Sequence, residues 1–432
     1  MHETNHFTYK NSNKKQPIFG ILLIILLTLF GAHLNTLDAA LSMYLFSGVL
    51  MGAILVRGRF GFAGGIKRIY YRGEGSLSKA LLLMLLVTST GFMAYQWWSA
   101  QNGAVPFYLA DANQTIIPGT QRVFPVDISL ILGAFLFGFG MIIADGCAGK
   151  ILTDTGEGQG HALLTLIFFI IGSIPGDWLR AKIEESMLGK FQYTFYFPEK
   201  LGFFGGFLFS LLLIGIVYFM IVRYENKRRK EKTYLRSQSD WLAFEKPIDE
   251  LETKQSLFFR TYHKLFIERF TFQKTVLLFS IMAIFTLLFS GNSWGVTIGF
   301  SETGLWAFEK LGITFQAEVF TDFYTNIQNG LFTSGTNVQN FGLVAGALLA
   351  FLLAGRFHLN FHINKKEMLY SILSGGIMGF GSRLANGATA GALYSSMASF
   401  SLSGWVVLLF MTLGALTSLK LLAGKSKFVP KR

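Results

Sequence analysis

Long apolar runs separated by shorter polar segments recur along the whole 432-residue chain. Clear examples cover residues 17–34, 80–97, 201–222 and 405–422. A helix of roughly 20 apolar residues crosses a bilayer core about 30 Å thick. Backbone polar groups in hydrocarbon must bond within the protein, and continuous runs favour helices over the alternating strands of a barrel. The pattern therefore predicts an all-α integral membrane protein.

About ten transmembrane helices are predicted from these runs. They fall near residues 17–34, 38–56, 79–97, 128–147, 161–178, 201–223, 274–291, 341–356, 368–387 and 402–422. The one sizeable polar segment, 224–272, is predicted to be a basic cytoplasmic linker between two transmembrane halves, 17–223 and 273–424. Apolar residues at helical spacing in 256–270 indicate a helix lying on the inner membrane surface. Short polar tails, 1–16 and 425–432, complete the division.

Basic residues gather in alternate intervals between the predicted spans. The clusters are Lys10, Lys14 and Lys15; Arg57, Arg59, Lys67, Arg68 and Arg72; Arg223, Lys227, Arg228, Arg229, Lys230 and Lys232; Arg356, Lys365 and Lys366; and Lys425, Lys427, Lys431 and Arg432. Each cluster lies an even number of spans from the N-terminus, so the positive-inside rule predicts that both termini are cytoplasmic. The net charge of +13 is explained by these loops and anionic lipid, without nucleic acid.

The remaining composition excludes several kinds of site. Only 15% of the residues are charged, against roughly a quarter in soluble domains. The single cysteine, Cys147, rules out an intrachain disulfide and a CxxC metal site. Residues 146–151 lack the spacing of a nucleotide-binding loop, and His358 and His362 lack a third ligand. The sequence predicts no metal site and no cofactor.

A glycine-rich motif occurs twice. Residues 138–146 and 379–387 both read G-F-G-x-x-[IL]-A-[DN]-G, displaced by 241 residues without a gap. The displacement corresponds to five predicted spans, an odd number, so the two copies should cross the membrane in opposite directions. Such inverted-topology repeats are common in transporters, with the substrate site near the midplane. Close packing of small residues between helices explains the glycines alone equally well.

Each motif continues into a further stretch of small residues, 144–149 in the first copy and 385–391 in the second. Helices are predicted to break there. Broken helices at membrane depth persist only where protein or a water-filled cavity surrounds them. The free N–H groups at the start of a half-helix favour anions. The sequence therefore predicts an anion site where short broken or re-entrant helices of the two repeats meet.

Several ordered motifs resemble the YeeE/YedE family of bacterial membrane proteins. Residues 57–63 resemble its R-x-x-x-C-F segment, and 137–149 with 157–159 resemble its GFG…GGC…EGQ segment. Residues 294–297, W-G-V-T, resemble the opening of its second half, and 379–387 with 400–405 resemble GFGARLA-x-GC…FSL. The resemblance covers most of the chain. It implies transport of a small sulfur-containing anion, such as thiosulfate or a related sulfur or selenium compound.

The resemblance also implies a substrate path lined by three cysteines, of which this chain keeps only Cys147. Gly61 and Ala388 stand at the other two positions. The candidate path residues are Gly61, Asp145, Gly146, Cys147, Lys150, Glu157, Arg383, Asn386, Gly387 and Ala388. Three of these residues also have a purely structural interpretation: Cys147 as a small buried residue, Asp145 as a helix cap, and Arg383 as one partner of an ion pair.

Three functions compete. The leading one is a transporter or channel-like permease in the bacterial inner (cytoplasmic) membrane, with no catalysis, whose partners are the anion and the lipid bilayer. The second is an intramembrane sulfur-transfer enzyme in which Cys147 carries a persulfide, although no base stands beside it in the sequence. The third is a membrane scaffold whose segment 224–272 docks a cytosolic sulfur-carrier protein.

Overall fold

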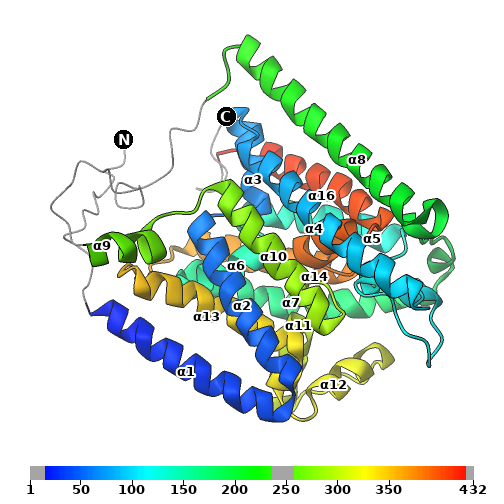
Figure 1. Ribbon diagram of the computed structural model, residues 1–432, viewed down its shortest axis with the longest axis horizontal. Coiled ribbons are helices and arrows are strands. Elements are labelled where there is room, and N and C mark those ends of the chain that lie inside the picture. The colour runs from blue at the N-terminus through cyan, green and yellow to red at the C-terminus, as the bar shows by residue number, and fades with distance from the viewer. Residues whose placement is uncertain (1–14, 236–256, 425–432) are drawn as a thin grey trace.

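Helices account for all the regular secondary structure among the residues that the computed structural model describes, 15–235 and 257–424 (Figure 1). The first half contains α1 (Gln16–Leu37), α2 (Ala39–Gly58), α3 (Phe62–Arg72), α4 (Ser76–Gln101), α5 (Ile128–Ile143), α6 (Ala148–Gly156), α7 (Gly160–Glu185) and α8 (Phe197–Lys230). The second contains α9 (Leu257–Tyr262), α10 (Phe272–Ser290), α11 (Thr297–Lys310), α12 (Thr321–Ile327), α13 (Gly335–Leu353), α14 (Lys365–Leu384), α15 (Ser396–Ala398) and α16 (Leu402–Leu421).

The predicted all-α membrane architecture is confirmed. Within the described ranges, nine helical stretches are long and apolar enough to cross a bilayer. The tenth predicted span corresponds to α14, which is 20 residues long but begins with Lys365, Lys366 and Glu367 and carries Arg383 in its last turn. These charges lower its hydropathy, yet α14 packs along both α5 and α7. Its protein surroundings explain how a less apolar helix occupies the centre of the bundle.

Glycines bring the central helices into backbone contact. A Cβ on Gly138 of α5 would lie 2.0 Å from the carbonyl oxygen of Met411 on α16. A Cβ on Gly379 of α14 would lie 2.1 Å from the carbonyl oxygen of Phe169 on α7. The two glycines open the two copies of the repeated motif, so the same close approach occurs in each half. Each motif helix therefore packs against a helix of the other half: α5 against α16, and α14 against α7.

The motif helices α5 and α14 run antiparallel. Gly133 near the start of α5 lies against Ala385 just after the end of α14, whereas Gly140 near the end of α5 lies against Ser374 in the middle of α14. Parallel contacts join α14 to α7, because Gly375 meets Thr165 and Gly379 meets Ser173. These directions agree with the odd number of spans predicted between the motifs.

The ends of the described helices sort the charged segments onto two faces. Helix α2 is antiparallel to α10, with Gly58 beside Thr275 and Tyr44 beside Phe289. Helix α10 is parallel to α4, since Ser280 bonds to Met84 and Gly91 lies against Ile284. The C-terminal end of α2 and the N-terminal end of α4 therefore share one face, which we call the basic face. The basic residues of the tails, 1–14 and 425–432, lie outside the described residues.

Two boundaries differ from the prediction. The basic run Lys227–Lys230 is the last turn of α8, whereas the sequence pattern predicts it in the linker. Lys, Arg and Glu are good helix formers, so this helix continues beyond its apolar part. The predicted span 128–147 ends at Ile143, because the helix breaks before Cys147.

The described part of the predicted surface helix packs against the bundle. It comprises α9 and one π-helical turn, His263–Ile267. The Tyr262 hydroxyl bonds the Leu353 carbonyl at the end of α13, and the Arg57 guanidinium donates to the carbonyls of Lys264 and Leu265. Residues 236–256 lie outside the described residues, so the division into two halves with a linker stays a prediction.

Candidate functional site

The two repeated motifs end in the same backbone turn. Asp145 has φ +58° and Asn386 has φ +60°, the left-handed conformation that Asp and Asn adopt more readily than most residues. The Gly146 N–H donates to the Met141 carbonyl at 3.2 Å, and the Gly387 N–H donates to Ser382 at 2.6 Å. Both bonds span five residues and end the helix as a Schellman motif does. The predicted helix breaks are therefore present at both motifs.

A new helical segment begins directly after each break. Cys147 is the extended residue before α6, with φ −84° and ψ 176°, and Ala388 is the extended residue before a π-helical segment, η9 (Thr389–Ser395), with φ −95° and ψ −160°. Gly61 stands in the same way before α3. The three positions that the family resemblance assigns to cysteine are thus the three residues that precede short re-entrant segments.

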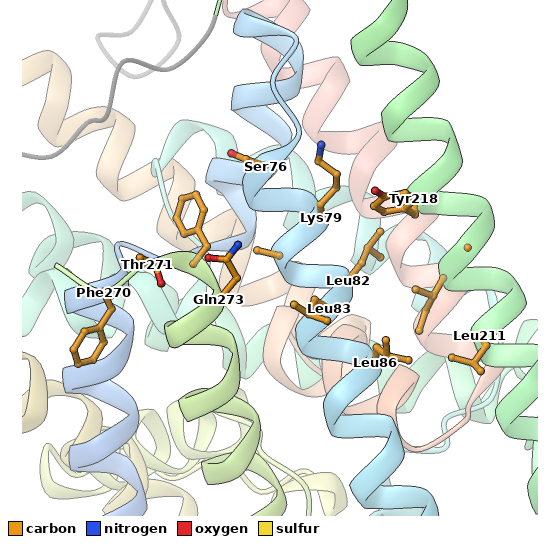
Figure 2. A pocket seen from close by; sticks show the side chains of 14 residues that line it. Ser76, Lys79, Leu82, Leu83, Leu86, Leu211, Tyr218, Phe270, Thr271 and Gln273 are labelled. Carbon is orange, nitrogen blue, oxygen red and sulfur yellow. The ribbon is translucent and has the colours of Figure 1, made fainter.

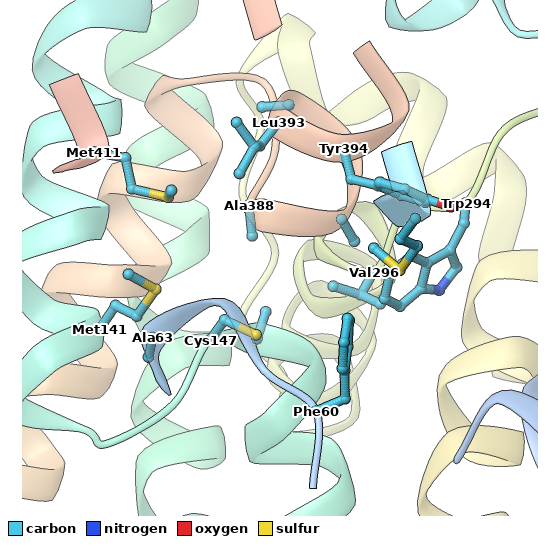
Figure 3. Close-up of a cluster of buried hydrophobic side chains, with 14 of the residues drawn as sticks. Phe60, Ala63, Met141, Cys147, Trp294, Val296, Ala388, Leu393, Tyr394 and Met411 are labelled. Carbon is cyan, nitrogen blue, oxygen red and sulfur yellow. The ribbon is translucent and has the colours of Figure 1, made fainter. Parts of the chain in front are cut away.

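These positions meet at a constriction in the centre of the molecule. A cavity of about 20 Å³ is lined by Gly61, Cys147, Lys150, Trp294 and Thr389, among others. Figure 3 shows Cys147 and Ala388 facing one another across this point, with Phe60 and Val296 beside them. That volume holds about one water molecule, so this conformation is closed to a larger solute.

The helix N-termini at the constriction provide positive potential. Helix α3 begins after Gly61, α6 after Cys147 and α11 after Val296. The first N–H groups of an α-helix have no partner within that helix and carry the positive end of its dipole. Helices α3 and α6 begin directly after residues that line the constriction, and α11 begins three residues after the lining residue Trp294. This arrangement suits a negatively charged solute.

A larger cavity, the basic vestibule, opens on the basic face. Its volume is about 350 Å³, and its charged lining residues are Arg57, Arg59, Lys150, Arg269, Arg356, Asp154 and Glu157. Leu55, Phe60 and Lys150 line both the vestibule and the constriction, so the two cavities adjoin. Five cations against two carboxylates make the vestibule attractive to anions.

Glu157 lies in the turn between α6 and α7, at the vestibule wall. Burial and the nearby Asp154 carboxylate raise the pKa of Glu157 to about 7, against the opposing effect of Lys150, Arg59 and Arg356. Burial disfavours the ionised carboxylate, and a neighbouring carboxylate does the same. The vestibule therefore changes its net charge near neutral pH.

Two predicted path residues are held by ion pairs. Asp145 accepts from Lys67 of α3 at 2.5 Å, which ties the first break to a re-entrant helix. Lys150 pairs with Asp154 one turn further along α6. Gly146 and Gly387 lie within the breaks, where a Cβ on Gly146 would meet Lys150 at 3.2 Å. Gly61, Cys147 and Lys150 line the constriction, Lys150 and Glu157 line the vestibule, and Ala388 faces Cys147. Asp145 and Gly146 lie in the break that directly precedes Cys147, and Asn386 and Gly387 lie in the break that directly precedes Ala388.

Arg383 is placed differently from these residues. Its Nε and Nη2 both approach Asp177 Oδ1 of α7 at 2.8 Å, and both side chains are buried. The second carboxylate oxygen of Asp177 accepts from Ser301 of α11. Arg383 therefore joins α14 to α7 and α11, which is the ion-pair alternative considered from the sequence.

Several residues in or next to the site are not identified as site residues by the sequence. Thr389 lines the constriction, Lys67 pairs with Asp145, and Arg122 contacts Gly295 and Gly391. The contacts of Lys67 and Arg122 join segments that are distant in the chain, and single-sequence patterns carry no signal for them. Trp294 was singled out only as part of the W-G-V-T motif. It lies in the constriction, 4% exposed, edge-on to Phe279.

A separate groove is not part of this site. Figure 2 shows a groove of about 860 Å³ between α4, α8 and the start of α10. Leu82, Leu83, Leu86 and Leu211 form its wall, with Lys79 and Tyr218 toward one end. It shares no lining residue with the constriction or the vestibule.

Comparison with known proteins now decides the family. Residues 57–417 match the family model described as sulphur transport. The chain belongs to this family. The match includes both breaks and the lining of the vestibule and the constriction apart from Leu55 and Val56, and it confirms the resemblance to the YeeE/YedE proteins. Helix α1 and most of α2 lie outside it.

Curated relatives of the sulphur transport family cover nearly the whole chain. It is 24% identical to "Thiosulfate transporter TsuA" of Escherichia coli (strain K12) over 379 residues, 87% of this chain and 92% of that protein. It is 22% identical to "Thiosulfate transporter TsuA" of Spirochaeta thermophila over 388 residues, 85% and 94% of the two chains. A shorter match, 24% over 126 residues, joins it to "Probable transporter YedE" of Salmonella typhimurium and covers 29% of this chain and 27% of that one.

Proposed function

We propose that this protein carries thiosulfate, or a related sulfur or selenium anion, across the bacterial inner membrane through the constriction at Cys147. The observation that carries the proposal is the convergence of Gly61, Cys147 and Ala388 beside the basic vestibule. Two full-length relatives named thiosulfate transporters support the choice of substrate. The vestibule then faces the cytoplasm, and both termini are cytoplasmic.

The geometry supports a path that attracts an anion and then strips its water. The vestibule and the helix N-termini offset the charge of the anion, whereas the constriction is lined by Phe60, Trp294 and Cys147 with little room for water. A thiol is a weak hydrogen-bond donor and a polarizable contact for sulfur. Cys147 supplies this contact without any covalent step. Such a non-covalent contact is sufficient for transport, whereas the alternative sulfur-transfer reaction requires a covalent persulfide on Cys147.

The missing family cysteines leave space at the path. A Cβ on Gly61 would have Lys150 Cδ at 3.6 Å as its nearest neighbour, and the extended backbone at Gly61 suits any residue. A cysteine therefore fits there sterically. We infer that Gly61 and Ala388 widen the passage relative to relatives with three thiols, so that a solute larger than thiosulfate also belongs to the substrate class.

Uptake into proteoliposomes tests the proposal directly. The panel contains radiolabelled thiosulfate, sulfite, sulfate and selenite, with wild type, Cys147→Ala, Gly61→Cys and Ala388→Cys. We expect wild type to take up at least one sulfur or selenium anion, and Cys147→Ala to slow that uptake by about tenfold, the equivalent of one weak polar contact in the rate-limiting state. Either added thiol should favour thiosulfate over the other anions.

Ser210→Ala is the matched control, because it removes one buried polar atom from α8, away from both breaks. It should leave uptake unchanged. No uptake of any anion in the panel by folded wild-type protein would overturn the proposal. Full activity of Cys147→Ala would overturn the assigned path.

The predicted docking of a cytosolic sulfur-carrier protein on segment 224–272 belongs with this proposal as a further partner. Most of that segment, 236–256, lies outside the described residues. Deleting 236–256 tests it: transport into liposomes that contain no carrier should continue, whereas growth of cells on the imported anion should fall if a carrier docks there.

A further inference from the structure

Arg122 approaches the constriction from the face opposite the basic vestibule. It ends a short 3-10 turn, Thr120–Arg122, in the connection between α4 and α5. This connection belongs to the first half and is anchored to two segments of the second half. The Gly119 N–H donates to Gly291 at the end of α10 at 2.9 Å, and the Ser396 hydroxyl donates to the Arg122 carbonyl at 2.7 Å.

Two glycines make room for the guanidinium. A Cβ on Gly295 would lie 2.3 Å from Arg122 Nη2, and a Cβ on Gly391 would lie 3.3 Å from Nη1. Gly295 follows Trp294, and Gly391 lies two residues after Thr389. Trp294 and Thr389 both line the constriction. The positive charge of Arg122 is therefore held between the two segments that form this side of the constriction.

No carboxylate forms an ion pair with Arg122 among the described residues. Its guanidinium donates to the Ser293 carbonyl at 3.3 Å, and Asp177, the buried carboxylate bound to Arg383, is already engaged. Burial and repulsion by Arg383 lower the pKa of Arg122 to about 10, so it remains cationic at neutral pH. A buried charge without a counterion is costly, and a bound anion would compensate it.

Two further donors, on the segment 293–295 that contacts Arg122, are buried and have no acceptor within the described part of the chain. They are the Trp294 indole Nε1 and the Ser293 hydroxyl, whose residues are 4% and 3% exposed. Buried donors are nearly always bonded, and each exception calls for an explanation. Arg122, Ser293 and Trp294 together offer a cation and two neutral donors, the set that oxygen atoms of a tetrahedral anion accept from.

We infer that Arg122, Ser293 and Trp294 form an anion-binding station that receives the oxygen atoms of the substrate before it reaches Cys147. The inference rests on the proposed function and specifies its outer binding site. The substrate is an oxoanion with at least two oxygens, oriented with oxygens on the guanidinium and the rest of the anion toward the constriction. Sulfite, thiosulfate and selenite meet this description, and halides do not.

Calorimetric titration of detergent-purified protein with thiosulfate, selenite and chloride tests the inference, using wild type, Arg122→Gln, Arg122→Lys and Ser293→Ala. Arg122→Gln should weaken oxoanion binding by about tenfold or more, as the loss of a charge-assisted hydrogen bond does. Arg122→Lys keeps the positive charge but lacks the planar guanidinium, so its oxoanion affinity should lie between those of wild type and Arg122→Gln. Ser293→Ala should weaken binding less. Lys190→Gln, which removes an exposed cation at the far end of α7, is the control and should bind as wild type does.

Gly295→Ala provides a second test if Arg122→Gln does not fold. It keeps every charge but places a Cβ where Nη2 now lies, so the guanidinium must move and oxoanion binding should weaken. Wild-type affinity in either folded variant would overturn the inference while transport itself stands. Absence of oxoanion binding and uptake in wild type would instead overturn the proposed function. Lower thermal stability with unchanged affinity would show that Arg122 only anchors the α4–α5 connection.

Discussion

Asp145 and Asn386 adopt the same left-handed backbone conformation, with φ +58° and φ +60°, at equivalent places in two copies of one motif. Asp145 pairs with Lys67 at 2.5 Å and its side chain is 39% exposed, whereas the Asn386 side chain carries no charge. The shared feature is thus the backbone turn, and the charge is an addition in the first copy. Asp and Asn serve the turn equally, since both tolerate this conformation.

This relationship separates two contributions to stability at position 145. Asp145→Asn keeps the turn and loses the partly exposed ion pair, so it should lower the free energy of unfolding by about 1 kcal/mol or less. Asp145→Ala should cost about 1 kcal/mol more, because alanine disfavours positive φ. Denaturant titration in detergent micelles measures both. Asn386→Ala, which tests the turn without the charge, is the control. Equal stability of the alanine and asparagine variants at 145 would contradict the role of the turn.

Two glycines on one helix predict opposite responses to the same change. Gly379→Ala puts a Cβ 2.1 Å from the Phe169 carbonyl oxygen, so α14 and α7 must separate, at a cost of about 1–3 kcal/mol. Gly376 lies one turn earlier on α14 with no atom within 4 Å of its would-be Cβ. Gly376→Ala should be neutral or stabilise by up to about 1 kcal/mol, because alanine is the better helix former. Thermal unfolding of the pair decides, and an equal loss in both would contradict the packing described.

The sequence was sufficient for features with a local or periodic signature. Apolar runs predict every long helix, and the two G-F-G motifs predict both breaks, because glycine, Asp and Asn at a helix end carry their conformational preference with them. The place of Cys147 beside Ala388 followed from the repeat. The end of a helix is harder to predict where its last turn is charged. The basic last turn of α8 looked like a linker, because hydropathy detects only the part of a helix that lies in hydrocarbon.

Contacts between distant segments were beyond the sequence. Arg122 meets Gly295 and Gly391 only because three separate segments converge, and no spacing in the chain encodes this. The sequence also does not identify the ion-pair partner of Arg383, because Asp177 lies 206 residues away in the chain. A buried arginine predicted that some partner exists, but several carboxylates qualified. The vestibule likewise draws its arginines from three stretches of chain.

The Asp177–Arg383 pair should be far more sensitive to substitution than exposed pairs. Asp177→Asn leaves the buried Arg383 uncompensated and should cost about 3–5 kcal/mol in free energy of unfolding. Glu185→Gln breaks an exposed pair with Lys182 and should cost about 1 kcal/mol or less. Denaturant titration compares them. Similar losses in the two variants would contradict the burial of the first pair.

A double variant tests whether Arg383 also belongs to the substrate path. Asp177→Leu with Arg383→Met replaces the pair by apolar side chains of similar size, which often preserves stability. If Arg383 only joins helices, the folded double variant should take up the anion at a rate within about threefold of wild type. The loss of one polar contact to the substrate would instead slow uptake by about tenfold. Loss of uptake by well-folded protein would return Arg383 to the path.

Glu157 predicts a pH dependence of anion binding at the basic vestibule. Burial and Asp154 raise the pKa of Glu157 to about 7, so the carboxyl is protonated on the acidic side and the vestibule becomes more positive. Anion affinity should therefore be higher near pH 6 than near pH 8 (about one unit either side of the midpoint), and Glu157→Gln should remove this step and keep the higher affinity throughout.

The raised pKa also means that Glu157 contributes stability fully present below about pH 4.5, which is lost as the pH rises through about 7. The glutamine variant should lose that slope as well. Calorimetry and thermal unfolding across this range measure both effects, with Glu231→Gln on the exposed end of α8 as the control. An unchanged pH response in Glu157→Gln would place the titrating group elsewhere.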